Sequence, residues 1–181
     1  MRVAELPLAG SFELTFEPSA DARGSFMRWY DREIFARHGL PTEWVQGNES
    51  SSKQNVVRGL HFQHPPYAES KLVRASVGIV YDVLVDLRRG SPSYGRWHAV
   101  ELSAAKRNAV LIPKRFAHGF CVLSTEATVT YLVDCPYSPT VEGGLVWNDQ
   151  DLSIPWPLTG EPIVSEKDRF LPRLNELKPL G

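Results

Sequence analysis

The sequence lacks the features that mark membrane-spanning, secreted or nucleic-acid-binding proteins. No apolar run approaches the roughly 18 residues that a spanning helix needs, and the first residues lack the apolar stretch of a secretion signal. The 20 basic and 21 acidic residues are dispersed along the chain and leave a net charge of −1, which favours neither nucleic acid nor an anionic membrane as a partner. We therefore expect a cytoplasmic protein that forms one domain over residues 1–181.

Reactive nucleophiles are also scarce. The two cysteines, Cys121 and Cys135, lie in apolar, strand-like surroundings without CxxC spacing, which favours buried free thiols over a disulfide or a pair of metal ligands. Residues 50–52 are three serines in a turn, but no GxSxG motif surrounds them. Hydrolysis through a covalent nucleophile is therefore disfavoured.

Helical periodicity is almost absent. Residues 31–40 carry an acidic first turn, an apolar side and a glycine stop, which predict one short helix; residues 11–17 alternate like a strand, and residues 19–26 resemble a turn. The rest consists of short β-branched and aromatic runs separated by Gly, Pro and Ser. The candidate strands are residues 43–50, 54–63, 70–77, 78–88, 95–102, 108–113, 118–124 and 127–135. We expect an all-β sandwich or barrel, such as a double-sheet jelly roll with a cavity between its sheets.

Three parts are expected within this domain. Residues 1–50 would form an N-terminal arm and the first strands, residues 51–147 the barrel core, and residues 148–181 a C-terminal segment that closes the site. Trp147 and Trp156 are expected to cap one end of the core. The charged run SEKDRF near the C-terminus fits either a solvated surface or part of a site.

Functional residues are expected in the stretch NVVRGLHFQHPPYAESKLVR. Arg58 and His61 interrupt an otherwise apolar strand, and the following strand opens with Lys71. Burying such groups is costly unless they are paired or used in a site. Strict alternation places Arg58 and His61 on opposite faces, so they can share a cavity only if Gly59 marks a bulge or a sharp twist. Taken alone, His61 also fits a satisfied core histidine.

A metal site fits these residues poorly. His61 and His64 are spaced HxxH rather than HxH, and His118 could supply a third ligand, but Arg58 and Lys71 would place positive charge beside the cation. Proton transfer at a carbon atom uses more of them. A histidine, with an ordinary pKa of roughly 6.5, suits the role of base, and an aspartate can orient it. A lysine can stabilise an enolate, a tyrosine on the opposite wall can return a proton, and arginines can hold an anion.

Several longer motifs extend over nearly the whole chain in this order: ADARGSF, VVRGLHFQ, KLVRASVGIVYDVLVDLRRGSPSYGRW, VELSA, IPKRFAHGF, VWND, DLSIPWPL and SEKDR. In these motifs the sequence resembles the dTDP-4-dehydrorhamnose 3,5-epimerase family, the epimerases of deoxysugar nucleotide biosynthesis. The resemblance implies a jelly-roll β-barrel of the cupin type with short peripheral helices. It also implies a homodimer that works without a metal or an organic cofactor.

The same resemblance implies catalytic roles. His61 would remove the proton beside the C4 ketone, with Asp168 as its carboxylate partner. Tyr131 would deliver a proton from the opposite side. Lys71 and His118 would stabilise the enolate oxygen.

Nucleotide handling is implied for a second group of residues. These are Arg23, Gln46, Gly47, Asn48, Arg58, Tyr137, Glu142 and Lys167. Tyr137 would stack on the base, and Arg23 would reach the site of a neighbouring subunit. The substrate-binding set also includes His118.

Two positions depart from the family pattern. Arg28 stands where the family commonly has a glutamate, and Gly47 stands where it commonly has an aspartate before Asn48. We therefore expect an epimerase of a nucleotide-linked 4-keto-6-deoxyhexose. The first candidate reaction is inversion of dTDP-4-dehydro-6-deoxy-D-glucose at C3 and C5 to dTDP-4-dehydro-L-rhamnose. The alternatives are a single-centre epimerase acting on a related nucleotide sugar and a non-catalytic sugar-nucleotide binding module.

Overall fold

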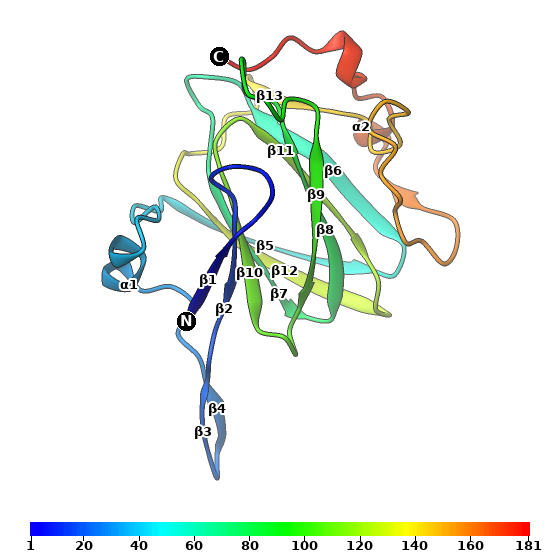
Figure 1. The fold of residues 1–181 in the computed structure, drawn as a ribbon. Coiled ribbons are helices and arrows are strands. Elements are labelled where there is room, and N and C mark those ends of the chain that lie inside the picture. The colour runs from blue at the N-terminus through cyan, green and yellow to red at the C-terminus, as the bar shows by residue number, and fades with distance from the viewer.

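The computed structural model describes residues 1–181 as two β-sheets that face each other (Figure 1). The first sheet has the order β1 (Arg2–Glu5), β2 (Phe12–Thr15), β10 (Asn108–Ile112), β7 (Lys71–Val77), β12 (Glu126–Val133) and β5 (Gln46–Lys53). The second has the order β13 (Glu142–Gly144), β6 (Val56–Gln63), β11 (Phe116–Val122), β8 (Ile79–Asp86) and β9 (Trp97–Ser103), and β14 (Ile163–Val164) pairs with β6 in parallel.

Neighbouring strands within each sheet mostly come from distant parts of the chain. β12 lies between β5 and β7, and β11 lies between β6 and β8. From β5 to β13 successive strands alternate between the two sheets, except that β8 and β9 both lie in the second, as in a jelly roll. The expected all-β, cupin-type jelly roll is confirmed, and each of the eight strands predicted from residue 43 onward is present with ends shifted by a few residues.

The main apolar core fills the space between the sheets, and β7 shows how a polar group enters it. Because side chains alternate along a strand, Lys71 shares the inner face of β7 with Val73 and Ala75. Leu72 points the other way and packs with Phe35 against the outer face of the first sheet. Lys71 therefore occupies a position at the end of a core-facing row.

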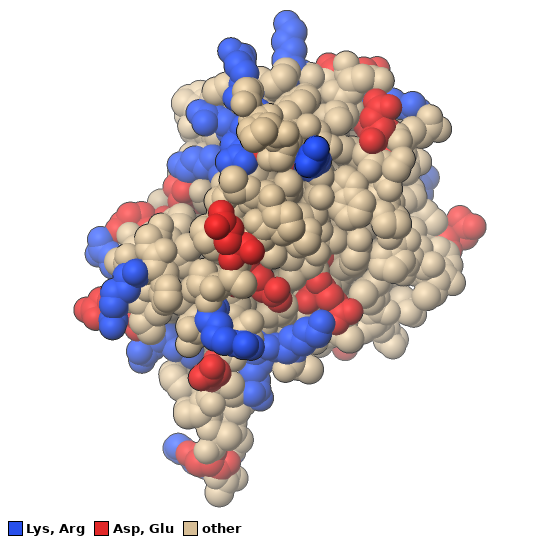
Figure 2. Space-filling model, in the orientation of Figure 1, with Lys and Arg blue, Asp and Glu red and all other residues tan.

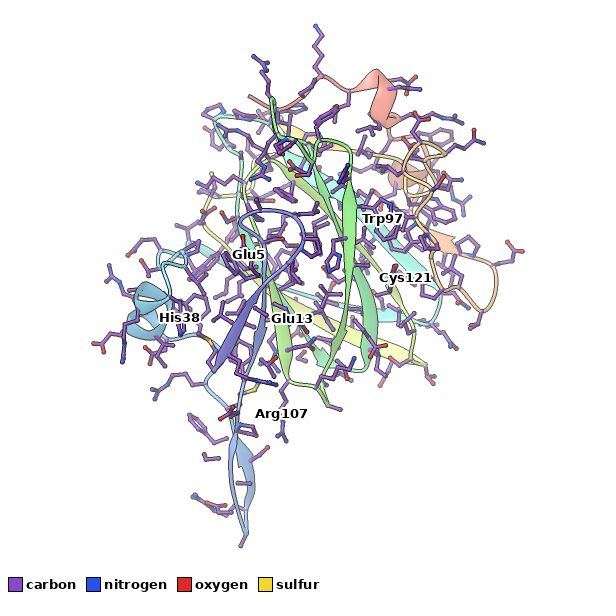
Figure 3. All side chains as sticks on the ribbon, in the orientation of Figure 1. Glu5, Glu13, His38, Trp97, Arg107 and Cys121 are labelled. Carbon is purple, nitrogen blue, oxygen red and sulfur yellow. The ribbon has the colours of Figure 1, made fainter.

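The longest helix of the chain, α1 (Arg32–Arg37), lies on that outer face. In α1 the side chain of Asp31 accepts hydrogen bonds from the backbone amides of Glu33 and Ile34, at 3.1 and 3.2 Å, which is a standard N-terminal cap. Phe35 is buried beneath the helix. His38 follows the last turn on the outside of the molecule (Figure 3). The predicted short helix is confirmed, and no helix of the chain is long and apolar enough to cross a membrane.

Two predictions need correction. Residues 19–26 form a hairpin, β3 (Ser19–Asp21) and β4 (Gly24–Phe26), rather than a plain turn, and this arm projects from the body of the protein (Figure 1). Its strands are fully exposed and poor in β-branched residues, so no burial pattern marked them. Cys121 is a buried free thiol as predicted, but Cys135, also free, is only half-buried.

The C-terminal segment returns across the second sheet. It adds β14 beside β6, then α2 (Glu166–Arg169) and the 3₁₀ helix η1 (Leu174–Glu176). Trp156 donates from its indole nitrogen to the carbonyl of Trp147 at 2.8 Å, and both pack against Val57 and Cys121. Both tryptophans are packed as predicted, but over a small cluster on the outer face of the second sheet rather than at an end of the main core.

Candidate active site

A cavity of about 570 Å³ opens between the two sheets. Arg58, His61 and His118 reach it from the second sheet, and Lys71 and Tyr131 reach it from the first. A smaller cavity of about 290 Å³ adjoins it and shares His61, Lys71 and Tyr131. The structure therefore brings the predicted catalytic residues of both walls to one place.

A β-bulge on β6 allows Arg58 and His61 to line the same cavity. His61 pairs with His118 on β11, but the register has shifted by the next pair, where Arg58 lies opposite Phe120. Gly59, with φ +120°, makes the shift possible, because a Cβ at this position would lie 2.6 Å from the Cα of Gly119. The bulge that the sequence required is confirmed.

His61 and Asp168 form a close pair. The Nε2 of His61 lies 2.7 Å from Oδ1 of Asp168, and the backbone amide of Gly59 donates to Oδ2 at 3.2 Å. An Nε2–H that donates to the carboxylate leaves the Nδ1 lone pair free to accept a proton. Burial would raise the pKa of the Asp168 carboxyl, but the hydrogen bonds from His61, Gly59 and Ser165 hold that pKa below its ordinary value. The Asp168 carboxylate is thus kept ionised beside His61.

Helix α2 positions that carboxylate. The hydroxyl of Ser165 accepts from the backbone amide of Asp168 at 3.1 Å and so caps the short helix. Asp168 is 3% exposed, whereas the flanking Lys167 and Arg169 are exposed. Both interpretations of the SEKDRF run hold in part, because Asp168 and Lys167 line the cavity while Glu166 and Arg169 lie at the surface.

A second histidine–aspartate pair lies beside the first. Nε2 of His118 is 2.8 Å from Oδ2 of Asp82, which is fully buried in the apolar strand β8. Burial raises the pKa of Asp82, and the opposing effects of His118 and Lys71 are smaller. Sequence reasoning assigned no role to Asp82, although an aspartate inside VYDVLV is the kind of signal that identifies a paired buried acid.

The first sheet supplies the opposite wall. Tyr131 lies on β12 between Asn48 of β5 and Val73 of β7, and burial, followed by the charge of Glu69, raises the pKa of its phenol. Nζ of Lys71 lies 3.2 Å from Oε1 of Glu69, and both side chains are 10% exposed. A protonated phenol and an ammonium thus face the two histidines across the cavity.

A chain of polar contacts spans the smaller cavity. The hydroxyl of Tyr137 donates to Oε2 of Glu142 at 2.9 Å, and Nζ of Lys167 lies 2.5 Å from the same oxygen. The backbone amide of Tyr137 donates to the side chain of Gln46 at 2.8 Å. Gln46, Asn48, Tyr137 and Glu142 all line this cavity, which groups half of the predicted nucleotide-binding residues, and Arg58 and Lys167 line the larger one.

Two predicted binding residues lie outside both cavities. Arg23 is at the tip of the β3–β4 arm, with its side chain 90% exposed and paired with Asp21. Gly47 faces away from the cavities, toward Leu132, because it alternates with Gln46 and Asn48 along β5. Within one chain, neither Arg23 nor Gly47 therefore contributes to the site. Arg28 also lies apart and pairs with Asp31 at 3.1 Å.

Other lining residues were missed by sequence reasoning, namely Ser50, Gln63 and Glu69. They are polar residues next to motifs, and no pattern in one sequence separates them from surface residues.

No group of three or more His, Cys, Asp or Glu side chains is arranged as a set of metal ligands. On the face shown in Figure 2, residues of both charge signs are intermixed.

Comparisons with known proteins agree with this geometry. A family model described as dTDP-4-dehydrorhamnose 3,5-epimerase matches residues 5–176. A dTDP-4-dehydrorhamnose 3,5-epimerase of Shigella flexneri is 46% identical over 158 residues, 86% of this chain and 87% of the relative. A dTDP-4-dehydrorhamnose 3-epimerase of Streptomyces niveus is 42% identical over 100% of this chain and 87% of its own.

A solved structure gives the same result. The dTDP-6-deoxy-D-glucose-3,5-epimerase of Legionella pneumophila, in complex with dTDP-4-keto-L-rhamnose, superimposes with a TM-score of 0.94 at 34% identity, covering 99% of this chain and 98% of that chain. A similarity of this extent in both sequence and fold identifies the chain as a member of the dTDP-4-dehydrorhamnose 3,5-epimerase family.

Proposed function

We propose that the protein inverts dTDP-4-dehydro-6-deoxy-D-glucose at C3 and C5 and so forms dTDP-4-dehydro-L-rhamnose. The observation that carries this proposal is the arrangement of two walls around one cavity, with the His61–Asp168 pair on one sheet and Tyr131 on the other. Inversion at carbon requires a base on one side and an acid on the other. The family supplies the substrate class, since the Legionella pneumophila relative was solved with dTDP-4-keto-L-rhamnose.

Each inversion proceeds through an enolate. The C4 ketone acidifies the neighbouring C–H bonds, and His61 takes the proton while Asp168 stabilises the resulting imidazolium. The electron pair moves onto the ketone oxygen, where Lys71 and His118 stabilise the negative charge. Tyr131 then returns a proton to the carbon from the opposite face. His61 releases its proton to solvent and Tyr131 regains one, so the cycle needs no cofactor.

The nucleotide occupies the remaining polar surface. Arg58 lines the larger cavity beside His61, where its guanidinium suits the pyrophosphate. Tyr137, 53% exposed at the smaller cavity, offers a flat ring for the base. Arg23 belongs to this function only if its arm enters a second subunit, so a homodimer is part of the proposal. We also propose that the chain forms a single domain in which residues 148–181 close the site, and that the protein is cytoplasmic.

The second candidate is inversion of one centre only. The Streptomyces niveus relative, which matches the whole length of this chain, is named a 3-epimerase. One base, one enolate and one acid serve either reaction, so the difference depends on how the sugar ring turns in the cavity. A binding module without catalysis is disfavoured, because nucleotide binding requires neither the His61–Asp168 pair nor Tyr131.

The test is proton NMR of the protein with dTDP-4-dehydro-6-deoxyglucose in D₂O. Deuterium should enter at C3 and at C5, and the product should have the L-rhamno configuration. Entry at C3 alone would establish the single-centre reaction. His61→Ala should abolish exchange and retain nucleotide binding, and His38→Ala is the matched control because His38 is exposed on α1. No exchange by the wild-type protein would contradict the proposed function.

A further inference from the structure

Glu69 is a buried acid to which the reaction above gives no role. It precedes β7, and its side chain is 10% exposed within the smaller cavity. Its Oε1 lies 3.2 Å from Nζ of Lys71, and its Oε2 accepts a hydrogen bond from Nε2 of Gln63 at 2.9 Å. A carboxylate removed this far from water persists only when it is both paired and hydrogen-bonded. Both conditions are met here.

Gln63 holds Glu69 in a fixed position. Gln63 is 2% exposed, and its amide nitrogen also lies 3.1 and 3.2 Å from the carbonyl oxygens of Tyr67 and Pro136, so that its two N–H groups are shared among three acceptors. Its amide oxygen accepts from the backbone amide of Ser138 at 2.6 Å. Because Gln63 is anchored on every side, Glu69 has a rigid support and cannot follow Lys71 if the lysine moves.

Lys71 has a second acid within electrostatic reach. Asp82, fully buried on β8, accepts from His118 through Oδ2, but its Oδ1 has no hydrogen-bond partner, and the charge of Lys71 acts on this carboxyl. In the structure the Lys71 ammonium pairs with Glu69, at 3.2 Å. The other titratable groups that line these two cavities are Arg58, His61, His118, Tyr131, Tyr137, Glu142, Lys167 and Asp168.

We propose that Glu69 is a positioning residue of the epimerisation, which holds the Lys71 ammonium in the cavity and away from Asp82. An ammonium has three N–H donors. Glu69 occupies one of them, which leaves donors free for the ketone oxygen of the substrate. Without Glu69 the Lys71 ammonium would lose the contact that fixes its position, and the unpartnered oxygen of Asp82 would compete for it. This inference rests on the proposed function, because it assigns Lys71 to the enolate oxygen.

Loss of this contact should affect kcat more than KM. The negative charge on the ketone oxygen develops only as the proton leaves carbon, so the Lys71 contact strengthens mainly in the transition state. Glu69→Gln keeps the shape of the side chain and an oxygen for Gln63, but it removes the charge that attracts Lys71. We expect kcat for deuterium entry at C3 to fall roughly tenfold or more, with KM within about twofold.

Glu101→Gln is the matched control. Glu101 also pairs with a lysine, with 2.7 Å between its Oε1 and Nζ of Lys106, but at the surface, where the two side chains are 45% and 56% exposed. This variant should retain wild-type kcat and KM. Glu69→Asp keeps the charge on a shorter side chain and should lie between wild type and Glu69→Gln. If Glu69→Gln does not fold in a thermal melt, Glu69→Asp alone provides the test, because wild-type kcat in that variant contradicts the proposal.

The outcomes separate this inference from the proposed function. An active wild-type protein together with a Glu69→Gln variant of unchanged kcat would overturn the role of Glu69 and leave the epimerase function standing. A raised KM at unchanged kcat would also overturn it, because Glu69 would then be a uniform substrate contact. A wild-type protein that exchanges neither proton would refute both.

Discussion

Replacing Asp168 by asparagine should slow proton removal from carbon by about 30- to 1,000-fold. The pair joins Nε2 of His61 to Oδ1 of Asp168 at 2.7 Å, a distance at which an imidazolium and a carboxylate attract each other by about 6 kcal/mol at an effective dielectric constant near 20. The His61 side chain is 31% exposed, so solvent screens part of this attraction. We expect about 2–4 kcal/mol to remain as stabilisation of the imidazolium that forms during the reaction.

The assay is the initial rate of deuterium entry at C3 in D₂O, measured for Asp168→Asn at saturating substrate. The amide keeps an oxygen for the His61 hydrogen bond, so the change isolates the charge rather than the contact. Glu166→Gln is the control, because Glu166 lies in the same short helix with an exposed side chain. It should leave the rate unchanged.

A rate for Asp168→Asn above half that of wild type would refute the assignment of the His61–Asp168 pair as the base. A rise in KM with no fall in kcat would also contradict it, because the stabilised charge exists only after proton removal. Thermal melts of both variants should be compared first, since Asp168 also accepts the backbone amide of Gly59 at 3.2 Å.

Three further changes test other parts of the structure. Tyr131→Phe should slow completion of inversion more than the first exchange at carbon, as measured by NMR of product configuration against deuterium content. Gly59→Ala should destabilise the fold by roughly 2–5 kcal/mol in urea unfolding, because its Cβ would lie 2.6 Å from the backbone of Gly119 at φ +120°. Asp86→Asn should lower the free energy of unfolding by roughly 2 kcal/mol at neutral pH. Burial opposes ionisation of the Asp86 carboxyl, but hydrogen bonds, above all from Arg88, outweigh it and lower its pKa to about 2. This contribution is complete above the ordinary pKa of 3.8 and is lost as the pH falls toward 2, so the difference between variant and wild type should vanish in acid.

The positions of the strands and the candidate catalytic histidine, His61, could be predicted from local patterns. Short alternating runs between Gly, Pro and Ser predict β-strands because burial on one face of a sheet repeats every second residue. His61 and Lys71 were conspicuous for the same reason, as polar groups in apolar rows. Arg58 and His61 required a bulge to meet, and Gly59 was the one residue between them that could supply it.

The tertiary structure decided which of several polar residues belong to the site. Glu69 and Gln63 resemble surface residues in sequence, yet they form a buried hydrogen-bonded pair beside Lys71. Arg23 matches a family motif, yet it extends into solvent on an arm and lines neither cavity of the site.

The sequence by itself determined the fold class, the positions of the strands and the family, because each depends on local periodicity or on motifs that are continuous along the chain. The family resemblance already implied the pairing of His61 with Asp168 and an opposite side for Tyr131. Only the tertiary structure gave the 2.7 Å contact between His61 and Asp168, which are separated by 107 residues, and placed Lys71 on the same wall as Tyr131. Such contacts depend on how strands from distant parts of the chain alternate between two sheets. That order is set by the packing of the whole core, and no local pattern contains it.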